Sequence, residues 1–183
     1  FSIIEEKRNL TENEAYMVMD SIMRAGNDET ENIVTPAQFG AFLIALRLKG
    51  EAVDEIVGMA RSMREHALHV DANTLPLLDT CGTGGSSKKV FNASTAAAFI
   101  ASAVGAKVAK HGNRAMSSRS GSADLLEEMG AVISLSPDSV VQCIEQVGIG
   151  FLFAQAFHPS MKFAGPLRPQ IGVRTIFNIL GPL

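Results

Sequence analysis

Apolar residues recur at helical spacing in three segments near the start of the chain, and two of these segments open with clear capping signals. Thr11 with Glu14 three residues later forms a capping box, and the apolar stripe that follows stops at Gly26. Thr35-Pro36-Ala37-Gln38 repeats the capping box, with proline at the first position of a second helix, and a third stripe covers 53–63. The pattern predicts a small bundle of three helices.

Further along, short apolar runs alternate with helical stripes. Strands are predicted at 75–79, 107–109 and 149–153, and helices at 94–104 and 122–129 and from Ser136-Pro137 to Gly148. Strand and helix in alternation are typical of a parallel sheet covered by helices. We therefore expect an α/β fold with a small N-terminal helical domain over residues 1–70, followed by the first part of an α/β domain over residues 71–183.

Composition narrows the class without naming a function. The chain is 46% hydrophobic and 19% charged with a net charge of -3, which is typical of a soluble globular protein and gives no general attraction to nucleic acid. No apolar run reaches the roughly 18 residues of a membrane span. We expect a cytoplasmic protein, and Phe1 at the start with Gly181-Pro182-Leu183 at the end indicates part of a longer chain.

The cysteines and the charges of the helical segment are interpreted as structural. Cys81 and Cys143 are too few for a disulfide framework, so we expect two small core residues. Basic residues among the first helices, Lys49 included, are interleaved with acidic ones such as Glu55, and we interpret them as a solvated mixed-charge face. The Met- and Phe-rich stripes are interpreted mainly as core, with a face towards a partner subunit as the alternative.

A first candidate site is the run Gly82-Thr83-Gly84-Gly85, which follows a predicted strand and precedes a predicted helix. Glycines allow backbone N–H groups to turn towards an anion, and a helix N-terminus adds partial positive charge, so the run is a candidate phosphate cradle. Asn92, Ser94 and Thr95 stand at the start of that helix. They are helix caps on one interpretation, while on the other Ser94 gives its hydroxyl oxygen to magnesium; spacing does not decide.

A second candidate site follows the strand predicted at 107–109. It joins cations, hydroxyls and glycines within thirteen residues that lack apolar periodicity: Lys110, His111, Gly112, Asn113, Arg114, Ser117, Ser118, Arg119, Gly121 and Ser122. An exposed polar loop is the plain alternative. We favour an anion-binding loop because this combination has no role in a core.

A third, weaker candidate comprises His158, Arg168 and Gly181-Pro182. Each is separately explained as a turn or surface residue. Together they suit a small planar acid, because an arginine pairs with a carboxylate through two parallel hydrogen bonds.

Four stretches, in this order and spacing, resemble one enzyme family: "GTGG…FNAST", "KHGNRAMSSRSGSADLLEEMG", "FLFAQAFHPSM" and "LRPQIGVRTIFNILGPL". The chain is similar over its whole length to the anthranilate phosphoribosyltransferases of tryptophan biosynthesis. The resemblance implies a helical domain joined to an α/β domain of the nucleoside phosphorylase type, a homodimer formed through the helical domain, and Mg²⁺ as cofactor. It also implies that the amine of anthranilate displaces pyrophosphate from phosphoribosyl pyrophosphate.

The resemblance assigns roles to the candidate residues. Those implied to hold phosphoribosyl pyrophosphate are Gly82, Thr83, Gly84, Gly85, Asn92, Ser94, Thr95, Lys110, His111, Gly112, Asn113, Arg114, Ser117, Ser118 and Ser122. Lys110, Asn113 and Arg114 are implied to act in catalysis, and Ser94 to bind magnesium. The implied anthranilate path comprises Gly82, His111, Asn113, His158, Arg168, Gly181 and Pro182. An acidic magnesium pair is expected beyond Leu183.

The chain departs from the family in the first loop, where Ser86-Ser87 and Val90 replace an aspartate-glycine pair and a threonine. Lys88 and Lys89 add charge there. Two alternatives stay open: a nucleoside phosphorylase of the same fold and, supported by these departures, a non-catalytic member that binds nucleic acid. The "KHGNR" loop and the "NILGPL" ending disfavour the first, and the acidic balance disfavours the second.

Overall fold

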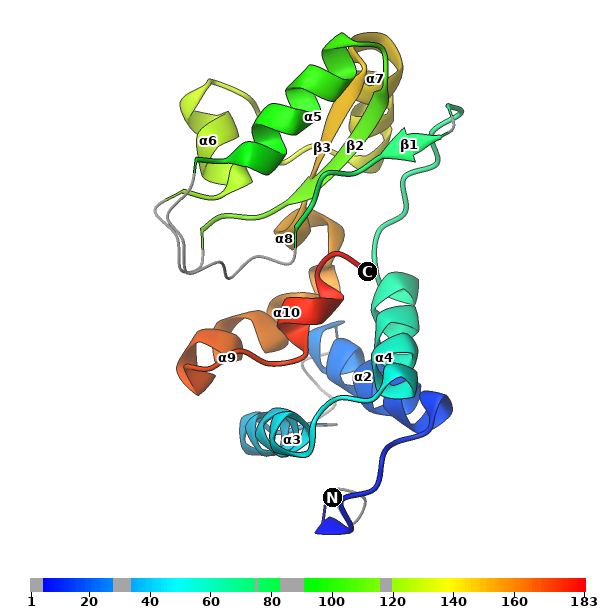
Figure 1. Ribbon diagram of the computed structural model, residues 1–183, viewed down its shortest axis with the longest axis vertical. Coiled ribbons are helices and arrows are strands. Elements are labelled where there is room, and N and C mark those ends of the chain that lie inside the picture. Colours follow the sequence, from blue (N-terminus) through cyan, green and yellow to red (C-terminus); the bar gives the residue numbers. More distant parts are fainter. Residues whose placement is uncertain (1–4, 28–33, 75, 83–90, 116–119) are drawn as a thin grey trace. The chain divides into compact units, whose positions relative to one another are not determined.

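The computed structural model describes residues 5–27, 34–74, 76–82, 91–115 and 120–183. The chain divides into two compact units. Unit 1 comprises residues 1–67 with 158–181 and residue 183, and unit 2 comprises residues 68–157 with residue 182. The elements of each unit are labelled in Figure 1.

Unit 1 is helical, as the apolar spacing predicts. Its helices are α2 (Glu12–Asn27), α3 (Pro36–Lys49), α4 (Val53–Glu65), the 3-10 helix η1 (Pro159–Lys162), α9 (Ala164–Ile171) and α10 (Phe177–Leu180). Both predicted capping boxes form: the Thr11 hydroxyl accepts from the Glu14 backbone N–H at 3.3 Å, and Gln38 and Thr35 exchange the corresponding bonds. The prediction of a helical bundle is confirmed.

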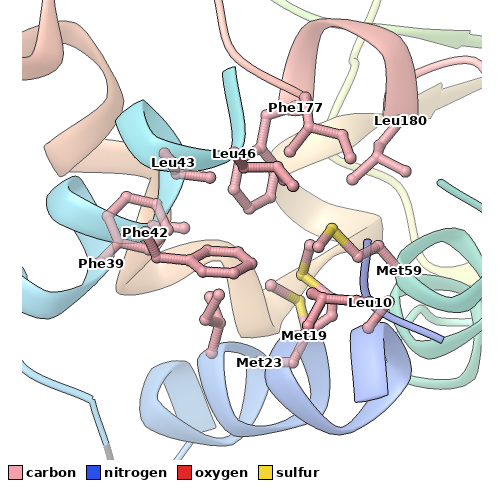
Figure 2. Close-up of a cluster of buried hydrophobic side chains, with 14 residues drawn as sticks. Leu10, Met19, Met23, Phe39, Phe42, Leu43, Leu46, Met59, Phe177 and Leu180 are labelled. Atoms are coloured by element: carbon pink, nitrogen blue, oxygen red, sulfur yellow. The ribbon is translucent and has the colours of Figure 1, made fainter. Parts of the chain in front are cut away.

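One apolar core holds unit 1 together, and it includes residues distant in sequence (Figure 2). Phe39 packs edge-on against Phe163, with 5.7 Å between ring centroids, and also contacts the ring of Phe177. The sequence prediction assigns residues 1–70 to the helical domain and all later residues to the α/β domain. Residues 158–181 nevertheless pack with the N-terminal helices, because their aromatic side chains complete this core.

Two predictions for unit 1 are wrong in detail. Lys49 and Glu55 do not belong to a solvated face: the Glu55 carboxylate is fully buried, with the Lys49 ammonium 2.9 Å away. Gly26 does not end its helix, since α2 continues to Asn27. A Cβ at Gly26 would lie 1.9 Å from the carbonyl oxygen of Ser160, so this glycine allows close packing against η1.

Unit 2 contains a parallel sheet with the order β1-β2-β3, as predicted for an α/β fold. The strands are β1 (Leu77–Leu78), β2 (Lys107–Gly112) and β3 (Ile149–Phe153), and the helices are α5 (Ala93–Ala103), α6 (Ser122–Glu128), α7 (Pro137–Val147) and α8 (Ala154–Phe157). Val108 pairs with Ile149, and the register continues to Gly112 opposite Phe153.

Alternation along β3 separates the two faces of the sheet. Phe153 and Phe151 pack in the cluster of Ala123 and Leu126 from α6, whereas Leu152 packs against α7. Successive strand side chains point to opposite faces, so α6 and α7 cover opposite sides of β3. Figure 1 shows α5 lying along β2 and β3 in the same unit. Within the described residues, none of the helices has the length and apolar character to cross a membrane.

Candidate anion-binding site at the carboxyl edge of the sheet

The carboxyl ends of β1 and β2 bring polar side chains together, because parallel neighbouring strands end at the same edge of a sheet. The Lys110 Nζ donates to the Thr80 hydroxyl at 3.3 Å, and that hydroxyl donates to the carbonyl oxygen of Ser94 at 2.8 Å. One hydrogen-bonded chain therefore joins β2, the segment after β1 and the start of α5.

Lys110 is the principal correction to the predicted site. The sequence places it in an exposed loop after a strand ending at residue 109, but β2 continues to Gly112 and the Lys110 side chain is buried, with 1% of its surface exposed. Burial lowers the pKa of the Lys110 ammonium, and the nearby Asp79 carboxylate opposes that shift. A buried cation is costly to desolvate, so this position is electrostatically prepared for an anion.

His111 points to the other face of the strand and contributes differently. Burial lowers the pKa of its imidazole, Asp79 opposes the shift and Lys110 adds to it. Burial therefore favours the neutral form of the ring. Its backbone N–H donates to the Asp79 carboxylate at 3.2 Å, which also accepts from the Cys81 backbone N–H at 2.9 Å. Asp79 thus ties together the two segments that leave the strands.

The start of α5 carries the three residues predicted to cap it or to bind phosphate. The buried Thr95 hydroxyl donates to the Asn92 side-chain oxygen at 2.8 Å, and the Ser94 hydroxyl lies 3.4 Å from the same oxygen. Hydroxyl and amide oxygens are ligands that Mg²⁺ accepts. The Ser94 hydroxyl is an oxygen donor of this kind, and its predicted part in binding magnesium stays a prediction.

Asp124 binds both described ends of the polar segment after β2. Its carboxylate accepts from the Gly121 backbone N–H at 2.7 Å and from the Ala115 backbone N–H at 2.8 Å, and these bonds lower its pKa. Gly112 has no room for a side chain, since a Cβ would lie 2.1 Å from the Ser122 hydroxyl. Gly112 and Ser122 are therefore adjacent.

Two of the predicted catalytic residues, Asn113 and Arg114, have hydrogen-bond or ion-pair partners within unit 2. The Asn113 side-chain oxygen accepts from the Arg114 backbone N–H at 2.8 Å, and the Arg114 guanidinium makes a two-pronged ion pair with Glu127. Its Cζ also lies 5.6 Å from the centroid of the Phe153 ring. In this structure Arg114 ties the loop to α6, and its predicted part in catalysis stays a prediction.

Part of the predicted site lies outside the described residues. This applies to Thr83, Gly84, Gly85, Ser117 and Ser118, and to the departures from the family pattern at Ser86, Lys88, Lys89 and Val90. Gly82, the first residue of the glycine run, is described and exposed. The predicted phosphate cradle is therefore represented by its first residue and by the helix start that follows.

The predicted anthranilate residues belong to both units. Gly82, His111, Asn113 and Pro182 fall in unit 2, and His158, Arg168 and Gly181 fall in unit 1. Arg168, on α9, is half-buried with its guanidinium 5.2 Å from the centroid of the Phe177 ring, and burial lowers its pKa. Within the described part of the chain no carboxylate lies at ion-pair distance from Arg168, which suits a carboxylate-binding role.

Sequence reasoning missed Asp79, Thr80 and Cys81. It interpreted Cys81 as a core residue, yet its side chain is only half-buried, and the Sγ atom lies 3.8 Å from the His111 Nδ1. Their position in the sequence could have identified them, because polar residues directly after one parallel strand lie close to those directly after the neighbouring strand.

Fold and site together define a helical bundle joined to an α/β unit with an anion-binding edge, and two family models match this organisation. Residues 3–67 match the helical bundle domain and residues 74–183 the a/b domain of the glycosyl transferase family. The chain belongs to this glycosyl transferase family.

Curated relatives of the chain give a narrower class within this family. The chain is 55% identical to the anthranilate phosphoribosyltransferase of Chloroflexus aurantiacus, over 97% of this chain and 50% of the relative. It is 58% identical to that of Roseiflexus castenholzii, over 96% of this chain and 49% of the relative. The chain spans about half the length of the curated relatives it matches.

Solved structures agree with the fold. The crystal structure of anthranilate phosphoribosyltransferase from Thermus thermophilus has a TM-score of 0.89 and 49% identity, covering 99% of this chain and 53% of that one. The Saccharomyces cerevisiae enzyme in complex with phosphoribosyl pyrophosphate and magnesium has a TM-score of 0.84 and 30% identity, covering 94% and 50%.

Proposed function

We propose that the full-length protein transfers the phosphoribosyl group of phosphoribosyl pyrophosphate to anthranilate. The observation that carries the proposal is the buried Lys110 ammonium beside the start of α5, in a chain more than half identical to enzymes of that name. Nucleoside phosphorylases share the fold type, but relatives at 55–58% identity carry the transferase name.

In the proposed reaction the amine nitrogen of anthranilate bonds to the anomeric carbon of the ribose as the bond to pyrophosphate breaks. The amine loses a proton to solvent or buffer. Lys110 offsets the charge that grows on the leaving group, and the N-terminus of α5 adds backbone N–H groups with the hydroxyls of Ser94 and Thr95. Arg168 pairs with the anthranilate carboxylate through two parallel hydrogen bonds.

Magnesium is proposed as the cofactor. When bound, it neutralises charge on the pyrophosphate oxygens. The Ser94 hydroxyl would hold it, together with ligands from substrate and water. The support is the oxygen donor set at the start of α5 and the magnesium complex of the Saccharomyces cerevisiae relative.

The test is the loss of anthranilate fluorescence when phosphoribosyl pyrophosphate and Mg²⁺ are added to the full-length protein. We expect turnover that disappears with EDTA and falls about 100- to 1000-fold in kcat/KM for Lys110→Met, the range typical for a charge-stabilising group. Lys107→Met, on the same strand, is the matched control, because its Nζ donates to the carbonyl oxygen of Glu145 away from the site. No loss of fluorescence, or equal loss for both variants, contradicts the proposal.

A homodimer formed through the helical unit is also proposed. Four large apolar side chains are exposed on α2, α3 and α4: Met17, Leu48, Val53 and Val57. Exposed apolar side chains favour association when a partner covers them. Light scattering of the full-length protein should give twice the monomer mass, and Val53→Glu should reduce it to the monomer mass; a monomeric parent contradicts this part.

A further inference from the structure

Asp79, Cys81 and His111 place three different ligand types at the carboxyl edge of the sheet. One carboxylate oxygen, the Sγ atom and one ring nitrogen all lie within 4.8 Å of one another. Cys81 and His111 are half-buried, while Asp79 is exposed. The cluster is therefore rigidly backed by the two strands and reachable from solvent through Asp79.

The separations agree with those of a zinc shell. Zinc takes thiolate sulfur at about 2.3 Å and imidazole nitrogen at about 2.0–2.1 Å, so a tetrahedral angle puts these two ligand atoms about 3.6 Å apart. The Cys81 Sγ and the His111 Nδ1 are 3.8 Å apart. A shift of a few tenths of an ångström brings both into bonding distance of one ion.

The third ligand is already held in place. The Asp79 Oδ1 accepts from the backbone N–H groups of Cys81 and His111, at 2.9 and 3.2 Å. Both bonds use the same oxygen, so the second carboxylate oxygen can bind a metal without breaking them. These bonds also fix the spacing between the two segments that carry sulfur and nitrogen, which lowers the entropy lost on metal binding.

We propose that Asp79, Cys81 and His111 form a site for a thiophilic divalent cation, zinc, with three protein ligands and one open position. On binding, the Cys81 thiol releases its proton to solvent as the sulfur–metal bond forms. A thiolate and a carboxylate balance the two charges of the ion, so the occupied site places no net charge beside the Lys110 ammonium. The site differs from that of magnesium, which prefers oxygen donors such as the Ser94 hydroxyl.

Occupancy has a consequence that rests on the proposed function. His111, and Gly82 next to Cys81, belong to the predicted substrate-binding residues, and a metal on His111 immobilises its ring. Zinc is therefore expected to inhibit the transferase by competing with substrate, and a zinc-selective chelator added with Mg²⁺ in excess is expected to restore activity.

Cobalt titration tests the site independently of activity. The full-length protein is freed of metal with chelator and reductant, dialysed and titrated with Co²⁺. We expect a sulfur-to-cobalt charge-transfer band in the near ultraviolet, with the strong visible bands of tetrahedral cobalt, and we expect Zn²⁺ to remove both. Cys81→Ser should lose the charge-transfer band, and Cys143→Ser should retain it because Cys143 lies on α7, away from the other two ligands.

His111→Asn provides the second variant, which retains the sulfur ligand and should weaken Co²⁺ binding at least about tenfold. Absence of the band in the parent, its persistence in Cys81→Ser, its loss in Cys143→Ser or unchanged affinity in His111→Asn would each overturn the site. A parent that shows the band but never consumes anthranilate would refute the proposed function and leave the metal site supported.

Discussion

The buried carboxylate of Glu55 allows a sharp test of what holds the helical unit together. Its Oε1 accepts from the backbone N–H of Leu10 at 2.8 Å, and its Oε2 accepts from the backbone N–H of Ala52 at 2.7 Å and from the Lys49 ammonium at 2.9 Å. One side chain therefore anchors the chain before α2 and the turn between α3 and α4. Glu55→Ala removes all three acceptor contacts at once.

The expected loss in the free energy of unfolding of Glu55→Ala depends on the buried polar groups that lose their acceptor. Each buried N–H left without an acceptor costs about 1–3 kcal/mol, and breaking a buried ion pair costs about 3–5 kcal/mol; these figures overlap and do not add. Lys49 retains two acceptors, the Asn9 side-chain oxygen at 2.8 Å and the Gly50 carbonyl oxygen at 2.7 Å. Because the ammonium is not stranded, we expect a loss of about 3 kcal/mol in the free energy of unfolding.

The assay is urea unfolding followed by tyrosine fluorescence. The chain has one tyrosine, Tyr16, and no tryptophan, and Tyr16 lies on α2, where its hydroxyl donates to Glu65 at 2.5 Å. Its emission therefore reports on the helical unit. Asp54→Ala is the matched control, since Asp54 is the exposed neighbour of Glu55 on α4 and should cost at most about 1 kcal/mol through the helix dipole.

A double variant separates the ion pair from the backbone contacts. Glu55→Leu combined with Lys49→Met removes both charges and fills the space, so it should be at least about 1 kcal/mol more stable than Glu55→Ala. A loss below about 1 kcal/mol for Glu55→Ala, or an equal loss for Asp54→Ala, would refute the anchoring role.

Three further outcomes follow from the structure. Gly58→Ala should lower the free energy of unfolding by about 1–3 kcal/mol, because a Cβ there would lie 2.1 Å from the carbonyl oxygen of Glu12. Gly40→Ala, with open space around it, should raise that free energy by about 0.5–1 kcal/mol. Urea unfolding midpoints measure both effects, and equal effects contradict the reasoning. Arg8 and the backbone N–H of Thr11 lower the pKa of Glu14 to about 2. The Glu14 carboxylate therefore stabilises the folded state fully above its usual pKa of 4.5, and this stabilisation is lost as the pH falls towards 2. A midpoint near 4.5 in an NMR titration of this carboxyl contradicts the prediction. Burial lowers the pKa of Lys110, so between its folded pKa and 10.5 the unfolded chain binds more protons, and the free energy of unfolding should rise with pH. Lys110→Met should remove this dependence on pH and raise the free energy of unfolding by roughly 1 kcal/mol at pH 7. An unchanged dependence on pH in the variant contradicts the prediction.

Local signals in the sequence predict the elements well, and long-range packing explains the failures. The boundary of α7 follows from Ser136, whose hydroxyl accepts from the Ser139 backbone N–H, and from Gly148 in the left-handed region at its end. Both are effects of neighbours in the chain. Burial of Glu55 depends on Leu10, 45 residues away, and the packing of Gly26 depends on Ser160, so periodicity carries no trace of either.

Lys110 shows why a buried polar residue leads to a wrong strand boundary when strands are predicted from the hydrophobic pattern. β2 buries Val108 and Lys110, which share one face of the strand, and an apolar residue at the second position would have extended the predicted strand beyond residue 109. The strand instead buries an ammonium beside the Thr80 hydroxyl and the start of α5, an arrangement that lowers the stability of the empty fold. Polarity at a position the sheet requires to be buried is therefore itself a sign of function, because an anionic substrate is what offsets the cost of desolvating the cation.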